Sequence, residues 1–296
     1  MIHVEAPICV APVGDRCGEG AVWHAAERAL YWTDINRFLI HRLDEDTQSV
    51  RTWMFDEPVT AMALTERDDT LLVVFGSKAQ LWQPASNTLG RILFELSGWP
   101  RMRCNDARVD PRGSLWIGTM RNNVGPGGED VEVPFTKGVL YRIDPNGAVS
   151  EWKHEIGISN TVAWSPAGDR FYFGDTVANV IWVFAFDKAT GNISKETRFL
   201  DEFPRGLPDG SAVDAEGFLW NTRPHAGCIV RISPSGDLDL AIELPIPNPT
   251  TCTFGGADRR TLYITSAGTG QRLAGSLFAV KTSVQGLEEN RFKLSA

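Results

Sequence analysis

The sequence lacks any apolar run long enough to cross a membrane. Its longest run, Val180 to Phe186, is far shorter than the roughly 20 residues that a membrane helix needs. An excess of positive charge is also missing, because the net charge is −8 and the isoelectric point is about 5.2. Nucleic acids and anionic membrane surfaces attract basic proteins, so we expect neither as a partner.

Signals for export and for disulfide formation are missing too. The first residues carry no basic stretch ahead of a long apolar segment, so we expect no secretory signal. The chain has five cysteines, scattered and without a Cys-x-x-Cys pair. A disulfide framework would need regular spacing and an oxidising compartment. We therefore expect five reduced thiols in a cytoplasmic protein.

Helical periodicity is absent as well, and a repeated β pattern takes its place. In each unit a short apolar strand is followed by a polar turn, an aromatic-rich strand and a third short strand. The first strands end at His24, Thr65, Asp110, Ser165, Asp214 and Gly255, 41 to 55 residues apart. Repeats of this length, with three or four strands each, are typical of β-propellers.

The repeat predicts an all-β fold, a six-bladed β-propeller. Residues 1–296 would form one domain, although the length alone also fits two. His3 to Val10 has the pattern of an extra strand. It would pair with the last blade and close the ring, which hides the exposed sheet edges. A β-sandwich with accidental internal similarity is the alternative.

A position shared by all six units carries an oxygen-bearing side chain. Five residues before each strand end stand Glu19, Thr60, Asn105, Asn160, Asp209 and Thr250. Equivalent positions on the innermost strands of a propeller surround one end of its central channel, so these side chains would converge. Alternatively, each polar residue merely begins a strand and solvates its loop.

Carboxylates that face each other call for a cation, because like charges held close oppose each other's ionisation. Asp, Glu and amide oxygens are hard ligands suited to Ca²⁺, Mg²⁺ or Mn²⁺. No Cys or His occupies the shared position, so a closed structural zinc site is not expected. The register therefore predicts one divalent cation on the axis.

Chain direction places each connection between second and third strands beside this ring. The longest, Arg121 to Lys137, is rich in Gly and Pro and is a candidate lid, with a loop of no function as the alternative. Of the five histidines, His225 alone falls on this face, where it is a candidate substrate contact. No Gly-x-Ser-x-Gly motif occurs, which argues against a serine hydrolase of the nucleophile-elbow type.

Short motifs across nearly the whole chain resemble the gluconolactonase, regucalcin (senescence marker protein 30) and LRE-like family. They are Gly18-Glu19-Gly20 with Trp23, Arg103-Cys104-Asn105-Asp106, Gly118-Thr119-Met120, Ser159-Asn160, Ser165-Pro166-Ala167-Gly168 and Asp209-Gly210. The resemblance implies a six-bladed propeller that hydrolyses sugar lactones with one divalent cation. Ca²⁺ is the first choice, and Zn²⁺, Mn²⁺ or Fe²⁺ are the alternatives.

The resemblance also implies roles for single residues. Glu19, Asn160 and Asp209 match the metal ligands, and Asp209 also matches the proposed general base. Arg103 and Asn105 match substrate contacts. Asp209 would accept a proton from the attacking water and deliver it to the leaving ring oxygen. A carboxylate bound to a cation is a weak base, so Asp209 could instead orient a water that the ion activates.

The substrate expected from the resemblance is a small aldonolactone, such as glucono-, xylono- or arabinonolactone. We expect the protein to be a monomer or weak homo-oligomer. A residue that is acidic in some family members is Asn123 here, which leaves the sugar open. Two rival functions remain. One is hydrolysis of other lactones or organophosphates, which would favour an apolar pocket. The residues expected on this face are instead polar and suit a polyol; they are Arg103, Asn122, Asn123, Arg223 and His225. The other is a calcium-binding propeller without turnover.

Overall fold

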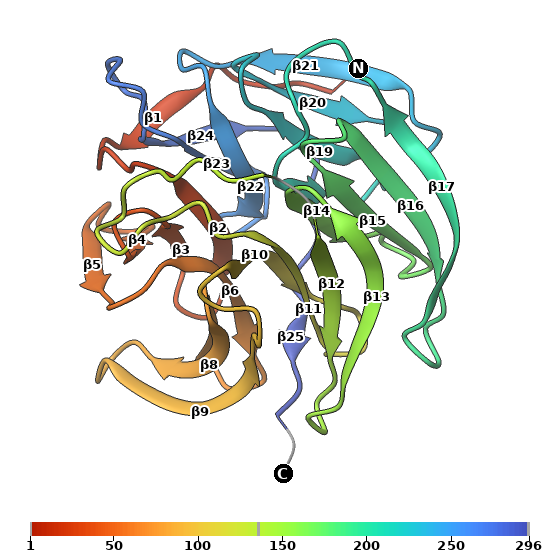
Figure 1. Ribbon diagram of the computed structural model, residues 1–296. Coiled ribbons are helices and arrows are strands. Elements are labelled where there is room, and N and C mark those ends of the chain that lie inside the picture. The colour runs from red at the N-terminus through yellow and green to blue at the C-terminus, as the bar shows by residue number, and fades with distance from the viewer. Residues whose placement is uncertain (1, 135–136, 295–296) are drawn as a thin grey trace.

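The computed structural model describes residues 2–134 and 137–294, and the regular elements of these residues are all β-strands. Six small sheets stand in a ring around a central axis (Figure 1). The chain is therefore an all-β, six-bladed propeller, as the repeat predicts. The described residues include no helix long and apolar enough to cross a membrane.

Each of the first three blades is a sheet whose strands follow in chain order from the axis outward. Blade 1 contains β2 Gly18–His24, β3 Ala29–Asp34, β4 Leu39–Asp44 and β5 Val50–Met54. Blade 2 contains β6 Val59–Thr65, β7 Leu71–Phe75, β8 Lys78–Gln83 and β9 Thr88–Glu95. Blade 3 contains β10 Met102–Val109, β11 Leu115–Arg121, β12 Gly138–Ile143 and β13 Val149–Ile156.

The last three blades repeat this plan, except that blade 6 takes one strand from the other end of the chain. Blade 4 contains β14 Ser159–Trp164, β15 Arg170–Asp175, β16 Val180–Phe186 and β17 Ile193–Asp201. Blade 5 contains β18 Ser211–Val213, β19 Leu219–Arg223, β20 Cys228–Ile232 and β21 Leu238–Glu243. Blade 6 contains β22 Pro249–Gly255, β23 Thr261–Ser266, β24 Leu277–Lys281 and β1 Ile8–Ala11.

Both ends of the chain tie the ring together. Strand β1 pairs antiparallel with β24 and closes the ring as predicted, although it begins later than the expected His3. The sequence analysis did not anticipate the second closure. Strand β25, Arg291–Phe292, pairs in parallel with the innermost strand of blade 2. Its two residues are too short to give a periodic signal.

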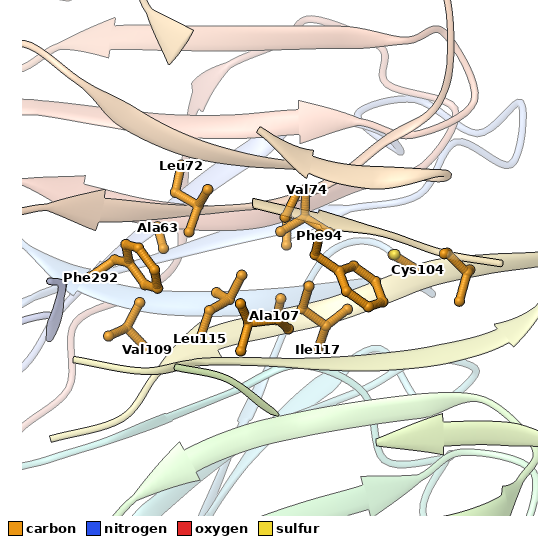
Figure 2. Close-up of a cluster of buried hydrophobic side chains, with 14 residues drawn as sticks. Ala63, Leu72, Val74, Phe94, Cys104, Ala107, Val109, Leu115, Ile117 and Phe292 are labelled. Atoms are coloured by element: carbon orange, nitrogen blue, oxygen red, sulfur yellow. The ribbon is translucent and has the colours of Figure 1, made fainter. Parts of the chain in front are cut away.

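Apolar side chains of neighbouring blades pack face to face and form the core. Figure 2 shows one such cluster, in which Ala63 and Leu72 of blade 2 face Val109 and Leu115 of blade 3, with Phe292 beside them. Tryptophans recur in this core. Trp32, Trp116 and Trp220 are fully buried, and each donates its indole N–H to an aspartate, at 2.8 to 2.9 Å. Paired in this way, the polar edge of each indole is satisfied inside the core.

A register shift recurs on the inner strands at the predicted ring position. The pairing of β2 with β3 slips between Glu19 and Val22, and that of β14 with β15 slips between Asn160 and Ala163. Comparable shifts occur in β6, β10 and β22. A β-bulge bends the strand and changes the direction of a side chain, often beside an active site. The bulges thus accompany the change from core-facing residues to residues at the mouth of the channel.

Candidate functional site

Two carboxyl groups meet at the channel mouth. Glu19 lies on β2, Asp209 lies just before β18, and their side chains share a hydrogen bond. Burial, followed by the charge of Asp106, raises the pKa of Glu19 to about 8. Burial, followed by the charge of Glu19, raises the pKa of Asp209 well above its usual range. The metal-free site therefore holds a proton near neutral pH that a cation could replace.

Two asparagines complete the cluster, and both are almost fully buried. The side-chain nitrogen of Asn105 donates to the Ser159 carbonyl at 2.8 Å and lies 3.3 Å from Oδ1 of Asn160. The side-chain nitrogen of Asn160 donates to Oγ1 of Thr176 at 2.8 Å. Since the amide nitrogens are held by these partners, the orientation of both carbonyl oxygens is fixed.

The two threonines at the shared position do not join the acids. Thr60 donates its hydroxyl to the Val74 carbonyl at 3.3 Å, and Thr250 donates its hydroxyl to the carbonyl of Gly18. Both hydroxyls therefore bond to backbone carbonyls, on β7 of blade 2 and on β2 of blade 1. Of the six side chains that the sequence predicts to converge, four therefore do so: Glu19, Asn105, Asn160 and Asp209.

Backbone strain accompanies the cluster at Thr161, which follows Asn160. Its φ is +56°, a conformation that a β-branched residue rarely adopts. The Thr161 hydroxyl donates to the backbone carbonyl of Asp209 at 2.6 Å, and Nδ2 of Asn221 donates to the same oxygen at 3.0 Å. These bonds stabilise the strained residue and tie the strand of Asn160 to that of Asp209.

Arg103 lies beside the cluster on β10, with 5% of its surface exposed. Its Nη1 donates to Oδ1 of Asn105 at 2.5 Å, so the two side chains share a face of the strand as expected from their spacing. Nε and Nη2 both donate to Oδ1 of Asn123, at 3.0 and 2.9 Å. Burial lowers the pKa of Arg103 to about 10, so the guanidinium stays charged at neutral pH.

Two other candidates from the sequence occupy different settings. His225 is exposed on the turn between β19 and β20, and its backbone N–H donates to Oδ1 of Asn248 at 3.0 Å. Arg223 is fully buried, and its guanidinium donates to the carbonyls of Arg205 and Gly206, both at 2.8 Å. The expectation that Arg223 contacts a polyol is wrong, because its side chain has no exposed surface and its other donors bond to Oδ1 of Asn221 and of Asn179.

The long connection of blade 3 is an ordered hairpin over the described part of its length. Val124 and Asp130 form a bridge, and the backbone N–H of Val131 donates to the Asn123 carbonyl at 2.8 Å. Nδ2 of Asn36, in blade 1, donates to the Gly128 carbonyl and to Oδ1 of Asp130, both at 2.9 Å. In Figure 1 this yellow-green loop reaches across to the orange strands of blade 1. It thus connects blade 3 to blade 1, which are not adjacent, at the end of the channel where Glu19 and Asp209 lie.

The donor set fits a hard divalent cation. In residues 2–134 and 137–294, no three His, Cys, Asp or Glu side chains gather as a metal-binding group, so an ion here needs amide oxygens as well. Glu19, Asp209 and Asn160 provide two carboxylates and a fixed carboxamide, and Asn105 lies next to them. Oxygen ligands of this type match Ca²⁺, Mg²⁺ and Mn²⁺.

Comparison with known proteins shows the family of the chain. Residues 17–268 match the family described as the SMP-30/Gluconolactonase/LRE-like region. The chain belongs to this family. It is 33% identical to the pentonolactonase XacC of Haloferax volcanii, with 86% of this chain and 82% of that protein covered. It is 32% identical to a 6-deoxy-6-sulfogluconolactonase of Pseudomonas putida, with 96% and 97% covered.

A solved structure shares the fold closely. The calcium-binding protein regucalcin of Agrobacterium tumefaciens superposes with a TM-score of 0.89, at 28% identity, and 97% of each chain is covered. Glu19, Asn160 and Asp209, to which the resemblance assigns the metal, lie at one end of the channel of this protein, and their role as ligands stays a prediction.

Proposed function

We propose that this protein is a metal-dependent hydrolase that opens sugar lactones to aldonic acids. The observation that carries the proposal is the contact between the half-buried carboxyls of Glu19 and Asp209, next to two fixed carboxamides and a buried arginine. Relatives that align over most of the chain are named as a pentonolactonase and a sulfogluconolactonase, which supports a lactone as substrate.

Glu19, Asn160 and Asp209 would hold the cation, with Ca²⁺ as the first candidate and Zn²⁺, Mn²⁺ or Fe²⁺ as alternatives. When bound, a divalent cation supplies a Lewis acid that polarises the ester carbonyl. Asp209 accepts a proton from the water as its oxygen bonds to the lactone carbonyl carbon. Asp209 then delivers this proton to the ring oxygen, the C–O bond of the lactone ring breaks, and a carboxylic acid forms.

Arg103 acts on the substrate. Its guanidinium uses four of its five N–H groups on Asn123, Asn105 and the Cys104 carbonyl. The remaining N–H and the positive charge are available for the oxyanion that develops on the carbonyl. Asn105 and Asn123 position this guanidinium, and we place them with His225 among the residues that face a polyol substrate.

The setting is consistent with a cytoplasmic enzyme of small-molecule metabolism. All five cysteines are free thiols, as expected in a reducing compartment. We propose a cytoplasmic monomer or weak homo-oligomer that binds neither nucleic acid nor membrane.

The test is turnover of a substrate panel by metal-free protein reloaded separately with Ca²⁺, Mn²⁺, Zn²⁺ or Fe²⁺. The panel contains glucono-, xylono- and arabinonolactone, an acyl-homoserine lactone and an organophosphate triester. We expect aldonolactone hydrolysis that a chelator abolishes and at least one metal restores. Ca²⁺ binding without turnover of any substrate would favour a non-catalytic calcium-binding propeller, and preference for the last two compounds would identify another esterase.

A further inference from the structure

The C-terminal segment crosses the far end of the channel and places a carboxylate there. Oε1 of Glu289 accepts a hydrogen bond from the Thr253 hydroxyl at 2.9 Å. The segment is fixed just beyond this point, because Nδ2 of Asn290 donates to the Val109 carbonyl at 3.0 Å. Phe292 is 1% exposed and packs between blades 2 and 3 (Figure 2). Glu289 therefore has a defined place in the channel.

A row of alternating charges runs from this carboxylate toward the acid cluster. Nη1 of Arg108 lies 3.6 Å from Oε1 of Glu289, and both side chains are largely buried. Arg108 and Asp106 stand two residues apart on β10, with Asp106 directly after Asn105. A small cavity of about 10 Å³, near the minimum needed to hold one water, is lined by Asp106, Arg108 and Glu289. Gly20 and Thr251, which follow ring positions, line it as well.

The charges of this row reach the cluster. Burial would lower the pKa of Arg108, but the charges of Glu289 and Asp106 outweigh it and raise that pKa. Asp106 directly follows Asn105 on β10 and lines the same small cavity as Gly20, which directly follows Glu19, so the row ends within one residue of two members of the cluster. Arg108 is therefore shared between two acids. Burial raises the pKa of Asp106 and the charge of Arg108 lowers it, and with both acids ionised the row carries one net negative charge. Without Glu289, the full charge of Arg108 would offset Asp106.

We propose that Glu289 is a positioning residue of the cation site: by pairing with Arg108, it keeps the negative charge of Asp106 directed at the ring. Glu289 touches neither substrate nor cation. It acts through the Arg108 guanidinium, and its effect is to raise the affinity of the site formed by Glu19, Asn160 and Asp209 for a divalent ion. This inference rests on the proposed metal-dependent function.

Chelator-competition titration with Ca²⁺, and separately with Mn²⁺, tests the proposal in the full-length protein. Glu289→Gln should weaken cation binding about 3- to 30-fold. A loss of this size is expected when one negative charge is removed from a partly screened protein interior near the cation. Glu288→Gln is the matched control. It removes the same charge one residue earlier, from a side chain that is 68% exposed, and should change the affinity by less than about twofold.

A double variant separates charge from structure. Arg108→Gln combined with Glu289→Gln removes both members of the pair and leaves Asp106 uncompensated, so the affinity should return to within about threefold of the wild type. A merely structural role for Glu289 predicts that the double variant binds worse than Glu289→Gln alone. That result, or an affinity in Glu289→Gln equal to that of Glu288→Gln, would overturn the proposal.

The wild type and Glu19→Gln, titrated in parallel, keep this failure apart from failure of the proposed function. A site that depends on Glu19 but is insensitive to Glu289 overturns only the role of Glu289. Absence of a Glu19-dependent site in the wild type overturns the metal-dependent function and this inference together.

Discussion

The metal-free protein disfavours negative charge on Glu19 and Asp209. The pKa of Glu19 is raised from 4.5 to about 8, so the folded chain retains a proton that the unfolded chain releases at lower pH. Stability falls with rising pH wherever the folded state binds more protons than the unfolded state. The two acids therefore lower the free energy of unfolding progressively as the pH rises above the normal pKa of a glutamate.

The melting temperature of the metal-free protein should consequently fall between about pH 5 and about pH 8. Glu19→Gln should flatten this dependence, because it removes one of the two coupled carboxyls, and excess Ca²⁺ should oppose it. Scanning calorimetry in a chelator provides the measurement, with Glu288→Gln as the control for net charge. A melting temperature that rises over this range would show that the two acids do not share a buried site.

Arg103 offers a separation of substrate binding from metal binding. A guanidinium close to a cation repels it, so this side chain is not expected to assist metal binding. Arg103→Ala should keep the metal and the fold but lower kcat/KM by ~10–1000-fold, or about 1.4–4 kcal/mol of transition-state stabilisation.

The exposed Arg101, two residues earlier, is the matched control for Arg103. Arg101→Ala should retain wild-type kinetics on gluconolactone, xylonolactone and arabinonolactone. If Arg103→Ala also hydrolyses all three at wild-type efficiency, the substrate face is assigned wrongly. Loss of the metal in Arg103→Ala would instead contradict the ring geometry.

At the scale of elements, the hairpin after β11 depends on a glycine. Gly128 has a φ of +79°, and a Cβ there would lie 1.8 Å from the Asn36 carbonyl oxygen. Gly128→Ala should therefore displace the hairpin from blade 1 and loosen Asn123, which holds Arg103. We expect KM for aldonolactones to rise about 3- to 30-fold, with less than about 1 kcal/mol lost in stability.

Gly127→Ala is the control for the hairpin, because a Cβ there meets only a carboxylate oxygen of the flexible Glu129, at 3.0 Å. Steady-state kinetics and hydrogen exchange of residues 124–131 give the two readouts. Faster exchange in Gly128→Ala with unchanged kinetics on every lactone would show that the hairpin has no role in substrate binding.

Elements with a repeated pattern could be predicted, and elements without one could not. Alternating apolar residues and turn residues mark the first three strands of every unit, so the blades and the ring register followed from the sequence. The two residues of β25 have no period, and their pairing with β6 depends on a chain crossing the whole molecule. The Asn36 contact with Gly128 likewise joins residues 92 positions apart.

Residue type alone could not distinguish the residues of the site from residues that only stabilise the fold around it. Arg103 and Arg223 both lie near the channel mouth in sequence register, yet only the fold shows that backbone carbonyls occupy the donors of Arg223. Thr60 and Thr250 stand at the shared position with Glu19, yet their hydroxyls bond to backbone. Local backbone geometry, which no pattern of residue types encodes, decides these cases.

At the scale of the whole molecule, ring closure brings together residues from distant parts of the chain. Glu19 comes from blade 1, Asn160 from blade 4 and Asp209 from the entry to blade 5. Strand β1 closes blade 6, and the C-terminal segment bonds to blades 2, 3 and 6. A cation at the ring would add a further tie among blades, so metal binding and global stability should be linked.

The most direct test of this account is the metal content of the purified protein and of two isosteric variants. Elemental analysis after dialysis against metal-free buffer should find close to one divalent ion per wild-type chain. Glu19→Gln and Asp209→Asn should each lose it, because a single remaining carboxylate leaves too little negative charge to hold the ion against water. Full metal occupancy in both variants would contradict a cation site shared by these two residues.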